Sequence, residues 1–358
     1  MEYRTLGSTD LKVSALGFGC IKFSKCTQED VTAALNRALD LGINFFDTAR
    51  NYGDSEEKIG KAIATRRDEF TLATKSASRD ADGLLADVET SLGNLRTDRV
   101  DVLFLHTVSD PPTWDKVTAP GGAIDGARRA KEQGKIRHIA VSVHRDLDTM
   151  RRAIESGAFE VLMPAYSAID SENVEPMLPL AAAANMGVVV MKGLSGGQLA
   201  SPPGPDGQPV SPDPVVEGAL RWVIANPHVT TVIPGMINAQ QVDDNFAAVD
   251  KGPLPDDQRD ELLRRIGCLG KAFRYGQTCL RCGYCQPCPQ EINIPAIFRA
   301  ADMFQKYPDN LKHMGTALYE AQQFTADHCE DCRACVERCP AGIDIPERLR
   351  EVAEMFAS

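Results

Sequence analysis

Short apolar runs alternate with longer amphipathic stretches from residue 13 to about residue 250. The runs are rich in branched and aromatic side chains, as in strands that are buried on both faces of a sheet. They predict eight strands, over 13–19, 43–49, 69–75, 100–107, 136–143, 160–166, 187–193 and 229–235. Apolar residues at helical spacing predict helices between them, for example over 55–64, 83–95, 147–157 and 214–226. Eight strand–helix units in a row predict an α/β fold, the (β/α)8 TIM barrel.

A doubly wound open sheet is the structural alternative. Such a sheet usually carries a glycine-rich phosphate loop after its first strand, and GFGCIKF at 17–23 does not have that pattern. Residues 3–17 predict two short strands around a Gly-Ser-Thr-Asp turn, a hairpin that suits the bottom of a barrel. The proline-rich stretch 201–214 predicts a surface loop at the active face, and Trp114 is expected in a loop after the fourth strand.

The strand pattern stops after about residue 265, and helix-like segments follow at 294–307 and 310–324. We therefore expect two domains. The first is a barrel over 1–266, and the second is an α-helical domain over 267–358.

Composition narrows the class of protein. Hydrophobic residues make up 43% of the 358-residue chain and charged residues 25%, as in ordinary globular proteins. The net charge of −11 leaves no basic stripe for a nucleic acid, so we expect none as a partner. The sequence has neither an apolar run of membrane-spanning length nor a signal peptide at its start, which predicts a cytoplasmic protein without a membrane partner.

Two cysteine motifs predict iron–sulfur chemistry, because cytosolic cysteines are seldom paired in disulfides. They are CLRCGYCQPCP at 279–289 and CEDCRACVERCP at 329–340. Each offers three thiolates at CxxCxxC spacing and then a cysteine followed by proline, which in two-cluster ferredoxins binds the other cluster. One [4Fe-4S] cluster is then expected on Cys279, Cys282, Cys285 and Cys339, and a second on Cys329, Cys332, Cys335 and Cys288.

A zinc ribbon is the alternative, but it would use two cysteine pairs and leave four cysteines without a role. The first motif has two residues between its third and fourth cysteines, whereas the ferredoxin spacing has three. Cys288 therefore departs from the ferredoxin pattern. The helical segment between the motifs resembles α-helical dicluster ferredoxin modules. Cys20, Cys26 and Cys268 are expected to be plain thiols.

The segment NFFDTARNYGDSEEKIGKAI at 44–63 resembles the signature of the aldo-keto reductases around their catalytic aspartate and tyrosine. A lysine ends the third predicted strand and a histidine ends the fourth. The resemblance implies a catalytic tetrad of Asp47, Tyr52, Lys75 and His106, at the strand ends where barrel enzymes keep their chemistry. With its cysteine-rich tail the whole chain is similar to the iron–sulfur branch of that family.

The implied roles agree with the chemistry of carbonyl reduction. Hydride addition leaves an alkoxide that needs a proton, and a phenol with a pKa of about 10 is a weak donor at neutral pH. Tyr52 is therefore expected to be the general acid and Lys75 the cation that lowers its pKa. Asp47 would hold Lys75, and His106 would orient the substrate oxygen.

The resemblance also implies a nicotinamide cofactor, although its contact positions match less well. Ser142 is kept in the segment that holds the nicotinamide amide, but Val143 stands where an asparagine is usual. Met163 stands in place of a glutamine. The segment at 191–199 could cradle a pyrophosphate through Lys192, Gly193 and Leu194.

The adenosine-binding segment is expected at 233–245, where Asp244 and Asn245 keep the family's acidic-Asn ending. Gly235 and Gln241 occupy the places of a lysine and an arginine that usually pair with the 2′-phosphate of NADPH. Without those cations a buried dianion has little to offset its desolvation. We therefore expect NADH in preference to NADPH.

Three hypotheses for electron flow remain open, because a nicotinamide transfers two electrons together and each cluster one at a time. In the first, the barrel performs NADH-linked carbonyl chemistry, and the tail exchanges electrons with a protein partner or braces the structure. In the second, the clusters feed a substrate or a bound flavin from an external ferredoxin-type donor. In the third, the protein is an electron carrier or redox sensor on a non-catalytic barrel.

Overall fold

The computed structural model divides into two compact units, Met1–Gly193 with Val216–Leu262, and Leu194–Val215 with Leu263–Ser358. The domain boundary near residue 267 stays a prediction. The residues that the structure describes are 1–144, 146–169, 171, 174–197, 199, 213–267, 279, 283–306, 312–339 and 342–357. The predicted loop at 201–214 therefore lies almost wholly outside the described residues, and so do Cys268 and Cys282.

A closed parallel sheet forms the centre of the first unit. Its strands run in chain order, each hydrogen-bonded to its neighbours in parallel. They are β3 (Phe18–Gly19), β4 (Phe45–Asp47), β5 (Thr71–Ser76), β6 (Val100–Leu105), β7 (Ile136–Val143), β8 (Val161–Pro164), β9 (Gly187–Val190) and β10 (Thr231–Val232). Bridges Leu16–Val232 and Gly19–Gly235 join the last strand to the first and close the barrel. The eight predicted strands and the TIM-barrel fold are confirmed.

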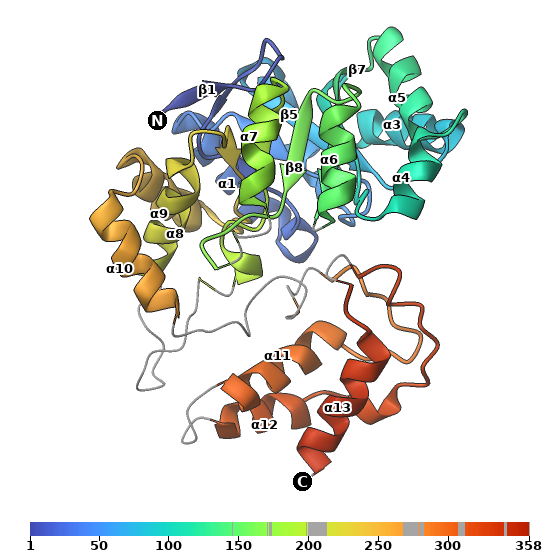
Figure 1. The fold of residues 1–358 in the computed structure, drawn as a ribbon, viewed down its shortest axis with the longest axis vertical. Helices are drawn as coiled ribbons and strands as arrows, with labels where there is room; N and C mark the ends of the chain where they lie inside the picture. The colour runs from blue at the N-terminus through green and yellow to red at the C-terminus, as the bar shows by residue number, and fades with distance from the viewer. Residues whose placement is uncertain are drawn as a thin grey trace. The chain divides into compact units, whose positions relative to one another are not determined.

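Helices lie outside the strands of this unit (Figure 1). They are α1 (Gln28–Asp40), α2 (Ser55–Ile63), α3 (Ala81–Leu95), α4 (Pro111–Thr118), α5 (Ala123–Glu132), α6 (Leu147–Glu155), α7 (Leu178–Ala183), α8 (Asp213–Ala225), α9 (Ala239–Asp250) and α10 (Asp256–Gly267). Side-chain oxygens of Thr27, Asp80 and Asp146 accept the backbone N–H three residues on, which caps α1, α3 and α6. Short 3-10 helices of this unit cover Phe23–Lys25, Ala64–Glu69 and Glu175–Met177, and a further one, Ser195–Gly197, belongs to the second unit.

The loop expected around Trp114 is wrong, because residues Pro111–Thr118 form α4. Asp110 accepts a hydrogen bond from the Thr113 amide at 2.8 Å, and proline follows at the first helical positions. This is a standard helix-start pattern that the sequence already contained. Trp114 therefore projects from a helix, where its ring lies 6.3 Å from that of Phe159.

A hairpin closes the bottom of the barrel, as predicted. Strand β1 (Tyr3–Thr5) pairs antiparallel with β2 (Lys12–Ser14). Its residues Leu6, Leu11 and Val13 share one buried cluster with barrel-interior side chains from the strands, among them Phe45, Ala73, Val102, Phe104, Ala140 and Met163. The barrel is therefore filled from this end, and its chemistry is left to the opposite end.

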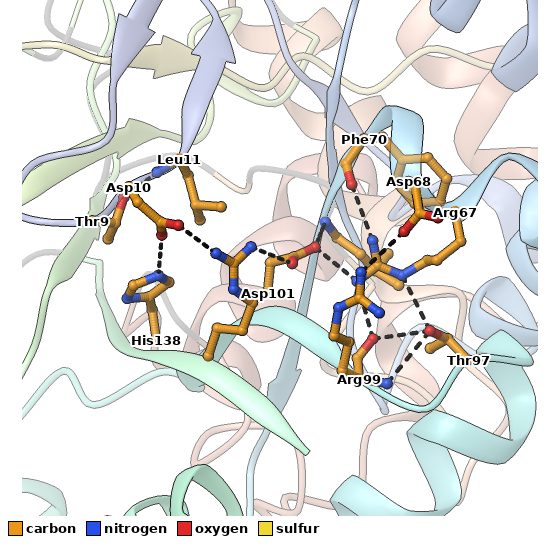
Figure 2. Close-up of polar contacts among 12 residues, drawn as sticks. Thr9, Asp10, Leu11, Arg67, Asp68, Phe70, Thr97, Arg99, Asp101 and His138 are labelled. Carbon is orange, nitrogen blue, oxygen red and sulfur yellow. Dashed lines mark hydrogen bonds and ion pairs between the residues drawn. The ribbon is translucent and has the colours of Figure 1, made fainter. Parts of the chain in front are cut away.

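Charged residues tie this hairpin to the strand starts (Figure 2). Asp10 accepts from Arg137 at 2.6 Å and lies 3.3 Å from the Nε2 atom of His138. Arg137 also reaches buried Asp101, which accepts from Arg67 at 2.7 Å. Exposed ion pairs of this kind contribute little singly, so we assign the network a role in registering the hairpin on the strands.

The second unit is helical where the structure describes it. It contains α11 (Ile294–Lys306), α12 (Lys312–Glu320), α13 (Ile345–Ala357) and a short 3-10 helix, Ala326–His328. Apolar residues of these helices form one core, in which the Tyr319 and Phe356 rings stack at 4.2 Å. Cys285 and Cys335 are buried in the same core. The predicted helical character of this region is confirmed.

No helix among the described residues has both the length and the apolar character that crossing a bilayer requires.

Candidate active site and cysteine centre

Strand alternation sets the positions of three site residues. Side chains along a strand point alternately to its two faces, so residues two apart share a face. Phe45, Ala73 and Phe104 lie in the buried cluster inside the barrel. The residues two positions further on, one layer nearer the carboxyl ends of the strands, are Asp47, Lys75 and His106.

Lys75 and Asp47 form a buried ion pair. The Nζ atom of Lys75 donates to both carboxylate oxygens of Asp47, at 2.6 and 2.5 Å, and to the Thr48 carbonyl at 2.7 Å. Lys75 is 1% exposed and Asp47 3%. Burial lowers the pKa of Lys75 and raises that of Asp47, and in each case the partner's opposite charge works against the shift. The close contacts offset part of the lost hydration of both groups.

Tyr52 lies in the turn after β4 and packs against this pair. Its ring centroid is 5.0 Å from the Lys75 Nζ atom and 5.9 Å from the centroid of the His106 ring, at 77°. The side chain is 8% exposed. Gly53 has φ of +61°, which lets the chain turn directly after the tyrosine. The structure thus brings all four residues of the predicted tetrad together.

His106 follows β6 and carries a neutral ring. Burial depresses the pKa of His106 well below its usual value, and the charges of Lys75, Arg79 and Lys192 depress it further. A neutral imidazole offers one N–H donor and one acceptor nitrogen. It can therefore donate a hydrogen bond to a substrate oxygen without bringing in a second cation.

The sequence did not reveal the residues that hold His106. Arg79 donates to the carbonyls of His106, at 2.7 Å, and of Thr107, at 3.1 Å. Thr107 has φ of +55°, a conformation that costs a β-branched residue free energy. An arginine shortly beyond a strand end was the available signal. Its target depends on how the loop folds back, which spacing alone does not give.

The predicted nicotinamide contacts are placed less favourably. The Ser142 hydroxyl accepts from the Thr107 amide at 2.8 Å, and Met163 is packed in the barrel core. Lys192 is half-buried, has φ of +61°, and its charge reaches His106. A side chain at Gly193 would come within 2.7 Å of Val232, so only glycine fits there without rearrangement. Ser142 and Met163 are therefore engaged within the barrel, whereas the charge of Lys192 contributes to the lowered pKa of His106.

The expected adenosine-binding segment contains Gly235 and Gln241, whose neighbours in the structure are as follows. A Cβ added to exposed Gly235 would lie 3.7 Å from the Lys22 Cγ atom, so a lysine stem from another part of the barrel runs beside this position. The Gln241 side chain accepts from the Ile237 amide at 3.1 Å as part of the α9 cap. The contact with Lys22 was not visible in the sequence pattern, because it depends on the closure of the barrel.

The remaining predicted positions are split between the two units. Asp244 is exposed and accepts from Gln240 at 2.8 Å, whereas Asn245 is buried at 7% exposure. Leu194 belongs to the second unit, where its carbonyl accepts from the amides of Gly197 and Leu199.

The second unit gathers cysteines from both motifs. Burial raises the pKa of Cys335. Cys285 and Cys335 lie in the core of this unit, and Cys279, Cys288, Cys329 and Cys339 pack against it. The assignment of Cys288 to the cluster of the second motif stays a prediction. The described cysteines of the two motifs are unbridged: Cys279, Cys285, Cys288, Cys329, Cys332, Cys335 and Cys339.

The expected ligands of both motifs are cysteine thiolates, which are soft donors. Within the described ranges, no three Cys, His, Asp or Glu side chains converge closely enough to hold one metal ion. Soft thiolates gathered in a partly buried loop suit a [4Fe-4S] cluster.

The closed barrel and the grouped Asp47, Tyr52, Lys75 and His106 define a TIM-barrel oxidoreductase. The model of the aldo/keto reductase family matches residues 15–217 and 208–264, and that of the 4Fe-4S dicluster domain matches residues 276–343. The chain belongs to the aldo/keto reductase family and carries a C-terminal 4Fe-4S dicluster domain. The resemblance inferred from the sequence is thereby confirmed.

Several known proteins are similar to this chain. An L-galactose dehydrogenase of Arabidopsis thaliana is 28% identical over 70% of this chain and 88% of its own. A D-threo-aldose 1-dehydrogenase of Pseudomonas sp is 27% identical over 55% and 71%. The solved structure of a Bacillus halodurans aldo-keto reductase in its holo form superposes with a TM-score of 0.63 at 28% identity, covering 74% of this chain and 96% of the other.

Proposed function

We propose that the barrel interconverts a carbonyl and an alcohol on a small molecule, with Asp47, Tyr52, Lys75 and His106 as its catalytic residues. The observation that supports this most is the buried Lys75 ammonium, held by Asp47 and 5.0 Å from the Tyr52 ring. A cation in that place has a chemical use, because it stabilises a tyrosinate as the phenol loses its proton.

A nicotinamide, when bound, supplies or accepts the hydride. The chain's own residues handle the proton and the substrate oxygen. In reduction, Tyr52 gives its phenolic proton to the developing alkoxide, and Lys75 stabilises the phenolate that remains. Asp47 keeps the ammonium in place, and the neutral His106 ring donates a hydrogen bond to the same oxygen. In alcohol oxidation the proton moves the other way, onto Tyr52.

For the cofactor we propose NADH in preference to NADPH, since neither Gly235 nor Gln241 offers a cation. Lys22 is the residue that could reverse this preference, because its stem runs beside Gly235. Lys22→Ala provides the test. If Lys22 takes no part in cofactor binding, the variant has the same ratio of kcat/KM with NADH to kcat/KM with NADPH as the wild type. If Lys22 binds a 2′-phosphate, the variant loses NADPH activity selectively.

The proposed substrate class is polyhydroxylated aldehydes and lactols. Two similar proteins are named as dehydrogenases of sugars, L-galactose and D-threo-aldose, so sugars are the first substrates to test. Aldoses and their reduced alcohols should be compared with simple aliphatic and aromatic aldehydes. Turnover confined to the simple aldehydes would contradict the sugar proposal.

The test of the function is anaerobic purification followed by assays with NADH and NADPH. Tyr52→Phe removes only the hydroxyl and is expected to lower kcat about 10²- to 10⁴-fold. Tyr3→Phe is the matched control, because Tyr3 is half exposed in the hairpin. Equal turnover by the two variants would refute the proposed role of Tyr52.

A cluster-fed reductase is the second candidate function. It is favoured by the placement of Ser142 and Met163, which are engaged within the barrel. Here an external ferredoxin-type donor would reduce the clusters, with a bound flavin as a possible converter between one- and two-electron steps. Bleaching of cluster absorbance by NADH alone requires such a converter. Cluster reduction by a ferredoxin but not by NADH, with substrate turnover, would favour this second function.

A further inference from the structure

One arginine side chain connects the two cysteine motifs of the second unit. Arg338 lies between Cys335 and Cys339, and its guanidinium donates to the carbonyls of Gln286, at 3.1 Å, and Pro287, at 3.3 Å. The Nε atom donates to the Ala334 carbonyl at 2.7 Å, which anchors the side chain on its own turn. Residues about fifty positions apart are thus joined directly in front of Cys288.

The segment before Cys288 needs such a contact. The first motif has one residue fewer before its last cysteine than the ferredoxin spacing, so spacing alone does not deliver that thiolate to the second motif. The Cys288 amide donates to the Gln286 side chain at 3.1 Å, and that side chain donates to the Ile292 carbonyl at 2.9 Å. These bonds shape the loop locally, whereas Arg338 attaches it to the other motif.

A guanidinium suits this position better than any other side chain. It is planar, always charged, and presents several N–H donors in a fixed fork, so it can bind two adjacent carbonyls at once. Its positive charge lies within three residues of two expected ligands, Cys335 and Cys339. A cluster held by thiolates is anionic, and nearby charge and hydrogen bonds set its reduction potential.

We propose that Arg338 is a positioning residue for the second cluster: it holds Cys288 at the corner that Cys329, Cys332 and Cys335 leave open. Of the ligands expected on the other cluster, Cys285 is buried in the helical core, and the Cys339 amide donates to the Val336 carbonyl at 3.0 Å. Both are therefore held without the guanidinium, and we expect Arg338 to act mainly on the cluster that Cys288 completes. The inference is independent of the carbonyl chemistry proposed for the barrel.

The test is iron release from anaerobically purified full-length protein to a ferrous chelator, with iron and sulfide counted beforehand. Wild type is expected to hold about eight irons per chain. Loss of a residue that orients metal ligands typically costs 10- to 100-fold in affinity, so Arg338→Ala should release about half of its iron at least tenfold faster than wild type. Reduced-state electron paramagnetic resonance should then show the signal of a single remaining cluster.

Two further variants complete the experiment. Arg348→Ala is the control, since Arg348 is a partly exposed arginine of α13 whose side chain donates to Glu351 and Gln305, outside both motifs. Arg338→Lys keeps the charge but loses the fork, and is expected to fall between wild type and Arg338→Ala.

The outcomes separate clearly. Unchanged iron release from Arg338→Ala, or zinc in place of iron in wild type, would overturn the proposal. If Arg338→Ala loses all of its iron and its helical circular dichroism, Arg338→Lys decides. Selective loosening of one cluster in Arg338→Lys supports the proposal, and uniform loss or wild-type behaviour contradicts it.

Discussion

Replacing Lys75 with methionine should destabilise the barrel as well as impair catalysis. Methionine has a similar length but provides no N–H donors, so Asp47 loses both bonds from the ammonium while remaining 3% exposed. Removing one partner of a buried ion pair costs about 3 to 5 kcal/mol, because the other charge is left without compensation. We expect a loss of unfolding free energy in that range at about pH 8.

A double-variant cycle separates this electrostatic cost from lost packing. Asp47→Leu combined with Lys75→Met removes both charges and should cost less than Lys75→Met alone. The coupling energy is then larger than the cost of Asp47→Leu alone, about 3 kcal/mol. Lys61→Met is the control, because Lys61 is half exposed and its ion pair with Glu57 is long, at 3.9 Å. That variant should change stability by less than about 0.5 kcal/mol.

The assay is urea unfolding followed by tryptophan fluorescence. The chain's two tryptophans, Trp114 and Trp222, both belong to the barrel unit, so the signal reports that unit. Without Lys75 burial raises the pKa of Asp47 in the folded state above its unfolded value of about 3.9. The folded variant then binds the extra proton, so its deficit shrinks as the pH falls from about 8 towards 5. A deficit below about 1 kcal/mol at pH 8, or strict additivity of the two substitutions, would refute the reasoning.

Three further predictions concern neighbouring features. Glu56 is 1% exposed and accepts from Arg50, Thr74 and Ser91, so Glu56→Gln should cost about 3 kcal/mol in the same assay. Asp87 is 29% exposed, and Asp87→Asn should cost less than about 1 kcal/mol. Equal losses from the two variants would contradict this. The depressed pKa of His106 means that the unfolded chain binds a proton that the folded chain does not, so stability should fall below about pH 6.5, and His106→Gln should flatten that fall; parallel pH curves would exclude it. A Cβ at Gly7 would lie 2.1 Å from the Gly187 amide nitrogen at a φ of +57°, so Gly7→Ala should cost more than about 1 kcal/mol, and a wild-type unfolding midpoint would contradict the hairpin packing.

The sequence predicted the barrel from its local pattern, and it predicted the tetrad from the resemblance of residues 44–63 to the aldo-keto reductase signature. Parallel strands bring their carboxyl ends to one edge, so a lysine and a histidine at strand ends had to be neighbours. The Asp110-Pro start of α4 and the Asn238 cap with Gln241 were also readable, and were missed. Arg79 and Lys22 could not be foreseen, since their neighbours are set by the path of loops and by closure between the first and last strands.

The alternation along β5 has a consequence for how this protein can be altered. Thr74 faces Glu56 on the helix side, and Lys75 faces the lumen. Inserting a single amino acid between Ala73 and Thr74 would turn the ammonium into the outer layer and leave a hydroxyl in its place. Insertions that alter substrate range therefore belong in the loops after the strands. Within each strand, the number of residues between the hairpin-covered end and the carboxyl end must be kept.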